Sequence, residues 1–180
     1  GPRSRIGRRM LDCAVVNRIS PIRARGAEEP STEISWWQVF LGIAVVSTTL
    51  LAGLGVLGLT GPDEPRYAAI ARTMAETGDW VTPRLYGHPW FEKPALYYWT
   101  AASAFRLLGV SEFAARLPSA LAALFATLVV AWAALRAFGM QAAWLTILML
   151  PTAVGMPVFA HAATPDMLFS AALAGAAVAA

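Results

Sequence analysis

Five charged residues in the middle and C-terminal parts of the chain are of types that take part in group transfer: Asp63, Glu64, Glu92, Lys93 and Asp166. A carboxylate can accept a proton from an attacking hydroxyl group, and an ammonium group can neutralise a phosphate. Lys93 is the only lysine beside thirteen arginines, and it stands in an aromatic, proline-framed loop. A compact ammonium in such a loop is a candidate phosphate ligand.

Each of these residues also has a structural interpretation. Asp63 has the position of an N-cap for a helix that starts at Pro65, and Asp166 follows Thr164-Pro165 in a first helical turn, where the helix dipole favours an acid. Glu92 and Lys93 are compatible with a solvated ion pair. Taken singly, none of them demonstrates a site.

A metal centre is the weaker hypothesis. Its candidate ligands are Glu92, His88 and His161, and their spacing matches neither a zinc site nor an Asp-x-Asp site. We expect no metal centre and no cofactor. Glu92 is the place where a divalent ion would bind if the protein used one.

The composition is that of a lipid-embedded protein. Of the 180 residues, 57% are hydrophobic and 14% charged, against about a quarter charged in soluble domains. A mean hydropathy of +0.54 and seven tryptophans agree with this. The high hydrophobicity excludes a disordered chain, and the single cysteine, Cys13, excludes an internal disulfide framework.

The net charge of +3 belongs to the N-terminal region. Residues 1–35 hold seven arginines against four acids, without apolar periodicity. We interpret them as a basic cytoplasmic tail, and Met10 is an alternative start of the protein. Because the basic excess is confined to this tail, we expect no nucleic-acid partner.

Four apolar segments define the expected fold, which is all-α: a polytopic transmembrane helical bundle. The expected spans are residues 36–59, 117–137, 141–160 and 167–180, the last one incomplete. At about 1.5 Å per residue, 24 residues give roughly 36 Å, enough for a hydrocarbon core of about 30 Å. Pro151 and Pro157 are expected to kink the third span. Residues 36–180 therefore form one membrane domain, the N-terminal part of a larger protein.

The outer loop, residues 61–116, is too charged to cross a membrane. Apolar residues at helical spacing predict a helix over 65–77 that ends at Gly78. Residues 95–108 predict an aromatic helix that lies in the membrane interface. Arginines before the first span place the N-terminus inside, so this loop and Asp166 share the outer face.

Three motifs in this order resemble one family of membrane glycosyltransferases. They are Asp63-Glu64-Pro65-Arg66-Tyr67-Ala68; Gly78-Asp79-Trp80-Val81-Thr82-Pro83-Arg84-Leu85 with Trp90-Phe91-Glu92-Lys93-Pro94-Ala95-Leu96; and Ala163-Thr164-Pro165-Asp166. The chain from Trp36 to its end resembles the GT-C class, in the branch of the lipid A aminoarabinose transferases and the protein O-mannosyltransferases.

The resemblance implies a GT-C fold, a polyprenyl-phosphate-sugar donor and transfer at the extracytoplasmic face of the cell inner membrane. The acceptor would be a lipid of the lipid A type, a protein or a glycan, and membrane lipids would surround the protein. This piece of the enzyme should be inactive by itself.

The resemblance also implies the roles of the residues. Asp63 would be the catalytic base and Asp166 a second acid or an orienter. Lys93 would neutralise the donor phosphate, with Arg66 as a further cation. The remaining substrate-binding positions are Tyr67, Glu92 and Glu64, of which Tyr67 would line the sugar pocket and Glu92 would hold the loop or a metal. If the acceptor is a phosphate, it needs no base, and Asp63 would position substrates.

Two other interpretations remain open. Proline-kinked spans with isolated acids also occur in transporters, which place their ionisable groups near the middle of the membrane. A non-catalytic assembly subunit would leave Lys93 and the outer acids unexplained.

Overall fold

The structure, a computed structural model, describes residues 34–180, so the predicted basic tail lies outside the described residues except for Ile34 and Ser35. The elements are α2 (Trp36–Leu50), α3 (Asp63–Thr77), β1 (Arg84–Leu85), β2 (His88–Pro89), α4 (Ala95–Leu108), α5 (Glu112–Phe138), α6 (Met140–Thr152), α7 (Gly155–Ala160) and α8 (Asp166–Ala179).

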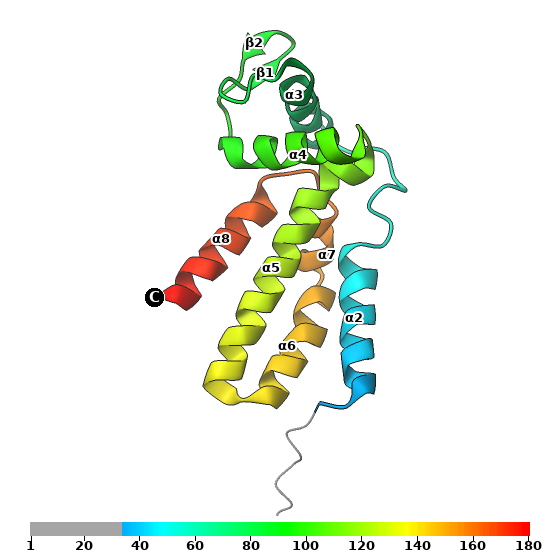
Figure 1. The fold of residues 1–180 in the computed structure, drawn as a ribbon, viewed down its shortest axis with the longest axis vertical. Coiled ribbons are helices and arrows are strands. Elements are labelled where there is room, and N and C mark those ends of the chain that lie inside the picture. The colour runs from blue at the N-terminus through cyan, green and yellow to red at the C-terminus, as the bar shows by residue number, and fades with distance from the viewer. Residues whose placement is uncertain (1–33) are drawn as a thin grey trace, which may run out of the picture. The chain divides into compact units, whose positions relative to one another are not determined.

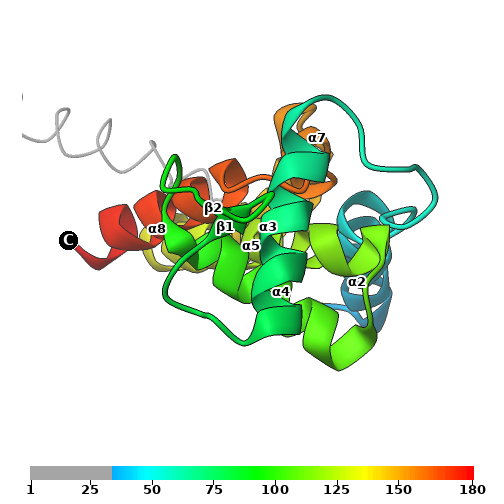
Figure 2. The ribbon, with the colours of Figure 1, turned by 90° about the horizontal axis from the view of Figure 1, so that it is seen from above.

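Within residues 34–180, a bundle of helices carries a smaller layer at one of its ends. Helix α5 runs through the middle of the bundle, with α8 on one side and α2 on the other (Figures 1 and 2). Helix α4 lies across the ends of α5 and α8, and α3 with the β-hairpin covers α4 (Figure 1). The start of α2 and the α5–α6 turn lie at the opposite end of the bundle from the layer with α3 and α4 (Figure 1).

Helix α5 is the one helix among the described residues that is long and apolar enough to cross a membrane. It has 27 residues and a mean hydropathy of 2.0 over its most apolar stretch. It begins earlier than the expected residue 117, because the Ser111 hydroxyl oxygen accepts a hydrogen bond from the Ala114 N–H and caps the helix at Glu112. Helices α2, α6 and α8 are apolar but have 15, 13 and 14 residues. Four spans therefore remain a prediction.

The expected span of residues 36–59 is helical only in its first part. Helix α2 ends at Leu50, and residues 51–57 form turns. Gly53 has a φ of 83°, which side chains disfavour, and a Cβ at Gly55 would lie 3.1 Å from the Cβ of Phe113. Glycines thus let the chain leave the helix and approach α5 closely.

The predicted third span, residues 141–160, is interrupted rather than only kinked. Helix α6 ends at Thr152 and α7 begins at Gly155, with Ala153 in an extended conformation. In a continuous helix Pro157 could not donate to the carbonyl of Ala153, four residues earlier, and its ring would crowd that carbonyl. The break lies one turn before this proline, and Pro151, the other proline expected to kink the span, lies inside α6.

The outer loop contains the two predicted helices. Helix α4 has the predicted bounds, and α3 ends at Gly78, whose φ of 75° fits a glycine C-cap. Helix α3 begins two residues before Pro65, with Pro62 at the N-cap, so the N-cap interpretation of Asp63 is wrong: it is the first helical residue. Asp166 lies in the first turn of α8, as expected.

The fold is mostly helical, and a small hairpin is its one β element among residues 34–180. Strands β1 and β2 are antiparallel and two residues long each. Their turn residues, Tyr86 and Gly87, have φ values of 50° and 83°, the positive values that a tight two-residue hairpin turn requires. The loop of residues 79–94 therefore has a defined shape beside the predicted site residues.

Aromatic residues and alanines fill the space between α3, α4 and the start of α5. The buried residues of this core include Tyr67, Ile70, Met74, Tyr97, Tyr98, Phe105, Ala114 and Ala115. The Tyr97 hydroxyl donates to the carbonyl of Ala115 at 3.0 Å and joins α4 to α5. Small alanine side chains let the helices approach closely, so α3 is held firmly over the bundle.

Candidate active site

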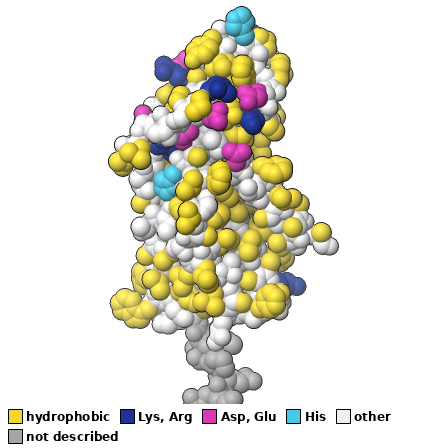
Figure 3. Space-filling model, turned by 180° about the vertical axis from the view of Figure 1, so that it is seen from behind, with side chains coloured by type: hydrophobic (Ala, Val, Ile, Leu, Met, Phe, Trp, Pro, Cys, Tyr) yellow, Lys and Arg dark blue, Asp and Glu magenta, His cyan; other side chains and the backbone are white. Residues whose placement is uncertain are grey.

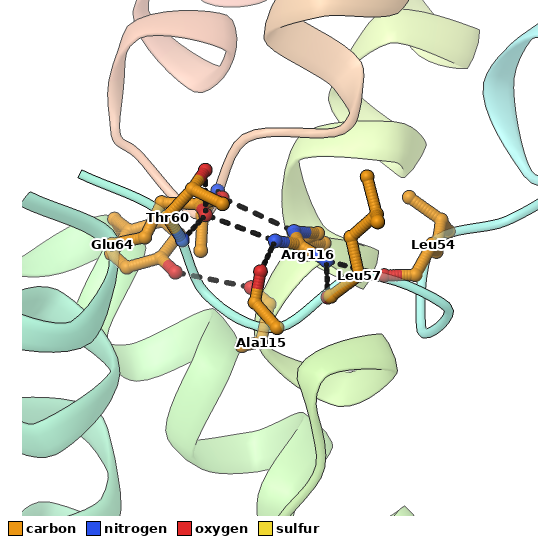
Figure 4. Close-up of polar contacts among 9 residues, drawn as sticks. Leu54, Leu57, Thr60, Glu64, Ala115 and Arg116 are labelled. Atoms are coloured by element: carbon orange, nitrogen blue, oxygen red, sulfur yellow. Dashed lines mark hydrogen bonds and ion pairs between the residues drawn. The ribbon is translucent and has the colours of Figure 1, made fainter.

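A buried ion pair joins α3 to α5. Arg116 and Glu64 are 4% and 5% exposed. The Arg116 Nε and Nη2 atoms donate to the Glu64 Oε1 and Oε2 atoms at 3.1 and 2.9 Å (Figure 4). Two parallel bonds between a guanidinium and a carboxylate fix the mutual orientation of both groups.

The Glu64 carboxylate also binds two other segments. It accepts hydrogen bonds from the Thr60 N–H at 2.7 Å and from the Ala163 N–H at 2.6 Å. Ala163 precedes Asp166 by three residues, and Glu64 directly follows Asp63. The carboxylate therefore ties the segments that carry the two predicted catalytic acids to each other.

The same contacts govern the ionisation of Glu64. Burial alone raises the pKa of this carboxyl, but the hydrogen bonds from Arg116, Thr60 and Ala163 and the charge of Arg116 outweigh it. They lower the pKa of Glu64 to about 2. Glu64 is therefore ionised at neutral pH, and protein groups occupy both of its oxygens.

Arg116 holds the irregular segment after α2. Its Nη1 atom donates to the carbonyls of Leu54 and Leu57 at 2.8 and 2.6 Å, and its Nη2 atom donates to the carbonyl of Gly58 at 2.9 Å (Figure 4). Residues outside a helix leave their carbonyls without partners, and a buried carbonyl without a partner is costly. The Arg116 side chain thus supplies the hydrogen bonds that let the chain after α2 leave the helix.

Asp63 lies at the surface beside this buried pair. Its side chain is 54% exposed, and its Oδ1 atom is 3.5 Å from Nη1 of Arg66. The same Arg66 atom is 3.5 Å from Oε2 of Glu92, and the guanidinium lies 5.8 Å from the Trp90 ring centre. Arg66 therefore stands between two carboxylates and connects α3 to the loop of residues 79–94.

Charged side chains gather at the end of the bundle that carries α3 and α4. Figure 3 shows basic and acidic groups close together around its upper part, and a mostly apolar surface over the bundle below. The picture agrees with the sequence pattern, because between residues 117 and 180 only Arg136 and Asp166 are charged. The ionisable groups therefore lie at an end of the bundle and away from its middle.

Tyr67 lies among the acids. Its side chain is 3% exposed, with its ring 6.2 Å from that of Tyr97 and 6.1 Å from that of Tyr98. Burial and the negative charges of Asp63 and Glu92 raise its pKa, and Asp166 contributes in the same direction. The phenol is therefore neutral at physiological pH and can donate a hydrogen bond.

Lys93 and Asp166 line one pocket. The pocket has a volume of about 270 Å³, and its other walls include Leu96, Leu168 and Phe169, from α4 and α8. No ion pair within residues 34–180 engages Lys93. The pocket thus combines a polar end with apolar walls, which suits an amphipathic ligand.

The residues considered for a metal do not come together in the described part of the chain. Within residues 34–180, no group of three His, Cys, Asp or Glu residues is placed to hold a metal ion. His88 is exposed on the hairpin, and both ring nitrogens of His161 lie near backbone carbonyls.

The structure thus separates the predicted site residues into two groups. Asp63, Arg66, Tyr67 and Glu92 lie together, and Lys93 shares a pocket with Asp166. Glu64 lies in the protein interior, where Arg116 and backbone groups use its oxygens. Arg116 was missed, although an arginine at the start of a long apolar helix is a signal that a counter-ion is required.

The comparison with protein families identifies the chain. Residues 35–178 match the family described as dolichyl-phosphate-mannose-protein mannosyltransferase. The chain belongs to this family. The match confirms the resemblance predicted from the sequence motifs, and it favours a transferase over a transporter or an assembly subunit.

Individual relatives point in the same direction. An undecaprenyl phosphate-alpha-4-amino-4-deoxy-L-arabinose arabinosyl transferase from Aeromonas salmonicida is 45% identical over 78 residues, which are 43% of this chain and 14% of the relative. An uncharacterised protein from Aquifex aeolicus is 32% identical over 71% of this chain and 31% of its own length. The chain spans about a seventh of the arabinosyl transferase.

Solved structures share the fold. ArnT from Cupriavidus metallidurans bound to undecaprenyl phosphate has a TM-score of 0.74 and 38% identity, over 78% of this chain and 26% of that one. Its apo form has a TM-score of 0.72 and 40% identity, over 76% and 25%. The helical arrangement of residues 34–180 is thus that of a GT-C glycosyltransferase.

We predict that Glu64→Gln destabilises the full-length protein by about 3–5 kcal/mol, because the Arg116 charge then stays buried without its counter-ion. The matched control is Glu76→Gln, which breaks the exposed pair of Arg72 and Glu76 at 2.6 Å and should cost less than about 0.5 kcal/mol. Thermal unfolding of the purified variants in detergent measures both. Equal losses would show that the buried pair has no special weight.

The low pKa of Glu64 also predicts an acid-dependent stability. A carboxyl with a lowered folded-state pKa stabilises the protein above its ordinary pKa of 4.5, and this contribution is lost as the pH falls toward about 2. We expect the unfolding temperature of the wild type to fall over this window more steeply than that of Glu64→Gln. Parallel pH curves for the two proteins would contradict the assignment.

Proposed function

We propose that the full-length protein is an integral-membrane glycosyltransferase that moves a sugar from a polyprenyl-phosphate donor to an acceptor at the outer face of the membrane. The carrying observation is the position of the charged groups at one end of a membrane-length helix. Lys93 and Asp166 line an apolar-walled pocket there, and Asp63 and Glu92 flank Arg66 at the same end of the bundle. Membership of the family supports the reaction class.

The donor fits the pocket between α4 and α8. A polyprenyl-phosphate sugar has a long apolar chain and a charged phosphate, and the pocket offers apolar side chains next to the Lys93 ammonium. The relative from Cupriavidus metallidurans was solved with undecaprenyl phosphate, a compound of this kind. We therefore assign Lys93 to the donor phosphate.

The proposed reaction is a displacement at the anomeric carbon of the sugar. The acceptor oxygen bonds to this carbon, the bond from the carbon to the phosphate oxygen breaks, and the electron pair leaves with the phosphate. Asp63 takes the acceptor proton, and Lys93 stabilises the charge that develops on the phosphate. A phosphate acceptor brings no such proton, and Asp63 then orients the substrates.

The other residues of the site have supporting roles in this proposal. Arg66 lies 3.5 Å from both Asp63 and Glu92 and fixes the positions of the two carboxylates. The neutral Tyr67 phenol donates a hydrogen bond to the sugar. Glu64 orients the segments of Asp63 and Asp166 through its buried contacts and does not touch substrate.

We also propose the membrane arrangement expected from the sequence. The N-terminus is cytoplasmic, the segments 36–59, 117–137, 141–160 and 167–180 lie within the membrane, and α3, α4 and the hairpin lie at the extracytoplasmic surface of the cell inner membrane. The gathering of both acidic and basic groups at the end with α3 and α4 supports this arrangement (Figure 3), and the opposite end has a basic residue, Arg136, in the last turn of α5. A lipid of the lipid A type is the first acceptor to test, because the named relatives are bacterial arabinosyl transferases.

The arrangement predicts which exposed positions are labelled from outside. In full-length protein without native thiols, a cysteine in place of Glu76 should react with an impermeant maleimide in intact cells. A cysteine in place of Phe138, which is 82% exposed at the opposite end of α5, should react only after permeabilisation. Labelling of both from the same side would contradict the arrangement.

Asp63→Asn should reduce sugar transfer at least about 100-fold with a hydroxyl acceptor, because an amide cannot accept the proton. The measurement incubates the full-length variant with labelled polyprenyl-phosphate sugar and follows the label into the acceptor. Glu76→Gln is the matched control and should transfer at the wild-type rate. Near-normal turnover of Asp63→Asn would remove Asp63 from the base role, and a small loss confined to phosphate acceptors would assign it to positioning.

Lys93→Ala should raise the KM for the donor about tenfold or more and leave the KM for the acceptor nearly unchanged. The reason is that a charge-assisted contact to the phosphate contributes about 1.5–3 kcal/mol. Lys93→Arg, which keeps the charge, should recover part of the loss. An unchanged dependence of rate on donor concentration in Lys93→Ala would place the phosphate elsewhere.

A further inference from the structure

Ser119 forms a hydrogen bond to a distant segment of the chain. Its hydroxyl group donates to the carbonyl oxygen of Thr164 at 3.1 Å, across 45 residues. Thr127 lies on the same helix, α5, and its hydroxyl group donates at 2.8 Å to the carbonyl of Ala123, four residues earlier. Both Ser119 and Thr127 are 0% exposed. The bond of Thr127 is a usual one for a hydroxyl group inside a helix, whereas that of Ser119 connects α5 to another part of the fold.

A tyrosine from α4 explains why Ser119 does not bond to its own helix. The carbonyl four residues before Ser119 is that of Ala115, and it accepts the hydroxyl group of Tyr97 at 3.0 Å. A carbonyl oxygen has two lone pairs, and within a helix one of them accepts the N–H four residues later. Because Tyr97 uses the other lone pair, the Ser119 hydroxyl group donates to Thr164 instead.

The segment that Ser119 contacts is a tight turn that is held on two sides. The Thr164 N–H donates to the carbonyl of Ala162 at 2.9 Å, which closes the turn. Between these residues, Ala163 is fully buried, and its N–H donates to Glu64 of α3 at 2.6 Å. The turn is therefore attached to α3 through the N–H of Ala163 and to α5 through the carbonyl of Thr164.

Asp166 depends on this turn for its position. Its side chain is exposed, and within residues 34–180 no hydrogen bond or ion pair engages its carboxylate. Asp166 lies in the first turn of α8, two positions after Thr164, and Pro165 between them has a φ of −73° that its ring restricts. The backbone of the turn therefore decides where the Asp166 carboxylate lies in the pocket that it shares with Lys93.

We propose that Ser119 is a positioning residue: its hydroxyl group holds the turn of residues 162–164 on α5 and thereby keeps the Asp166 carboxylate in the pocket beside Lys93. This inference rests on the proposed transferase function, in which that pocket receives the donor. Ser119 is fully buried and does not touch substrate. Bulk water cannot replace a fully buried hydroxyl group, so its removal leaves the Thr164 carbonyl without this donor.

The test uses two variants of the full-length protein, each of which removes one buried hydroxyl group from α5. Ser119→Ala removes the bond to Thr164. Thr127→Val is the matched control, because it keeps the shape of the side chain and removes only the bond to Ala123 within the helix. The two variants differ in whether the lost bond reaches the turn before Asp166.

The first measurement is hydrogen–deuterium exchange in detergent, which needs no substrate. In Ser119→Ala, the amide hydrogens of residues 162–164 should exchange about three- to tenfold faster than in the wild type, because one hydrogen bond that holds the turn is lost. Thr127→Val should leave the exchange of these amides unchanged. Unchanged exchange in Ser119→Ala, or an equal increase in both variants, would overturn the tie between α5 and the turn.

The second measurement is the rate of sugar transfer for each folded enzyme molecule. Ser119→Ala should lower kcat about three- to thirtyfold and leave the KM for the donor nearly unchanged, because a misplacement of about 1 Å in a site can cost about 100-fold in rate. Thr127→Val should keep the wild-type kcat. A wild-type kcat in Ser119→Ala would reject the positioning role.

A double-mutant cycle decides whether Ser119 acts through Asp166. In an Asp166→Asn background, Ser119→Ala should change kcat by less than about twofold, because the carboxylate that it positions is already absent. If the two losses multiply instead, Ser119 affects the site by another route and the proposal is wrong. If the wild type transfers no sugar, the proposed function fails, and the exchange rates still decide whether the tie exists.

Discussion

The ion pair of Glu64 and Arg116 is the constraint on which the rest of this structure depends. Taking two charges out of water costs several kcal/mol for each ion, and the cost is met only when every donor and acceptor finds a partner. Here the partners come from four places along the chain: the segment after α2, the start of α3, the start of α5 and the turn before α8. The pair can form only when these four places meet, so it selects one arrangement of the end of the bundle that carries α3 and α4.

The pair also gives two adjacent acids different surroundings. Glu64 points into the protein, where its oxygens are used, and Asp63 stays at the surface beside Arg66. Two acids next to each other at the start of a helix therefore differ in accessibility, because one of them faces the interior of the fold. The Asp63 carboxylate stays accessible, with its Oδ1 atom 3.5 Å from Arg66 of the same helix.

Local signals were sufficient to predict much of the fold. Helix α4 has the predicted bounds, and Gly78, Gly109 and Gly139 end helices with positive φ values, as their positions indicated. The end of α2 was not predictable from hydropathy, because residues 51–59 are as apolar as the helix before them. Their departure from the helix requires Arg116, 58 to 62 residues later in the chain, and no window of sequence contains that contact.

The candidate site was likewise predictable only in part. The acids and Lys93 were found because charged residues are rare here and stand in recognisable motifs. Their grouping was not deducible: Arg66 joins Asp63 to Glu92, and Lys93 shares a pocket with Asp166. The hairpin that brings Trp90 to Arg66 depends on positive φ values at Tyr86 and Gly87. Only the glycine is a residue type from which a positive φ value can be predicted.

The walls of that pocket have a consequence for how a carrier would arrive. Leu96, Leu168 and Phe169 belong to a helix lying across the bundle and to one running along it. A chain that stays among the acyl tails would reach such a place by lateral diffusion, a two-dimensional search that never exposes it to water. Moving one methylene group of the carrier from lipid into water would cost about 0.8 kcal/mol, and this path avoids that cost. Only the headgroup of the carrier would change its solvation when the carrier binds.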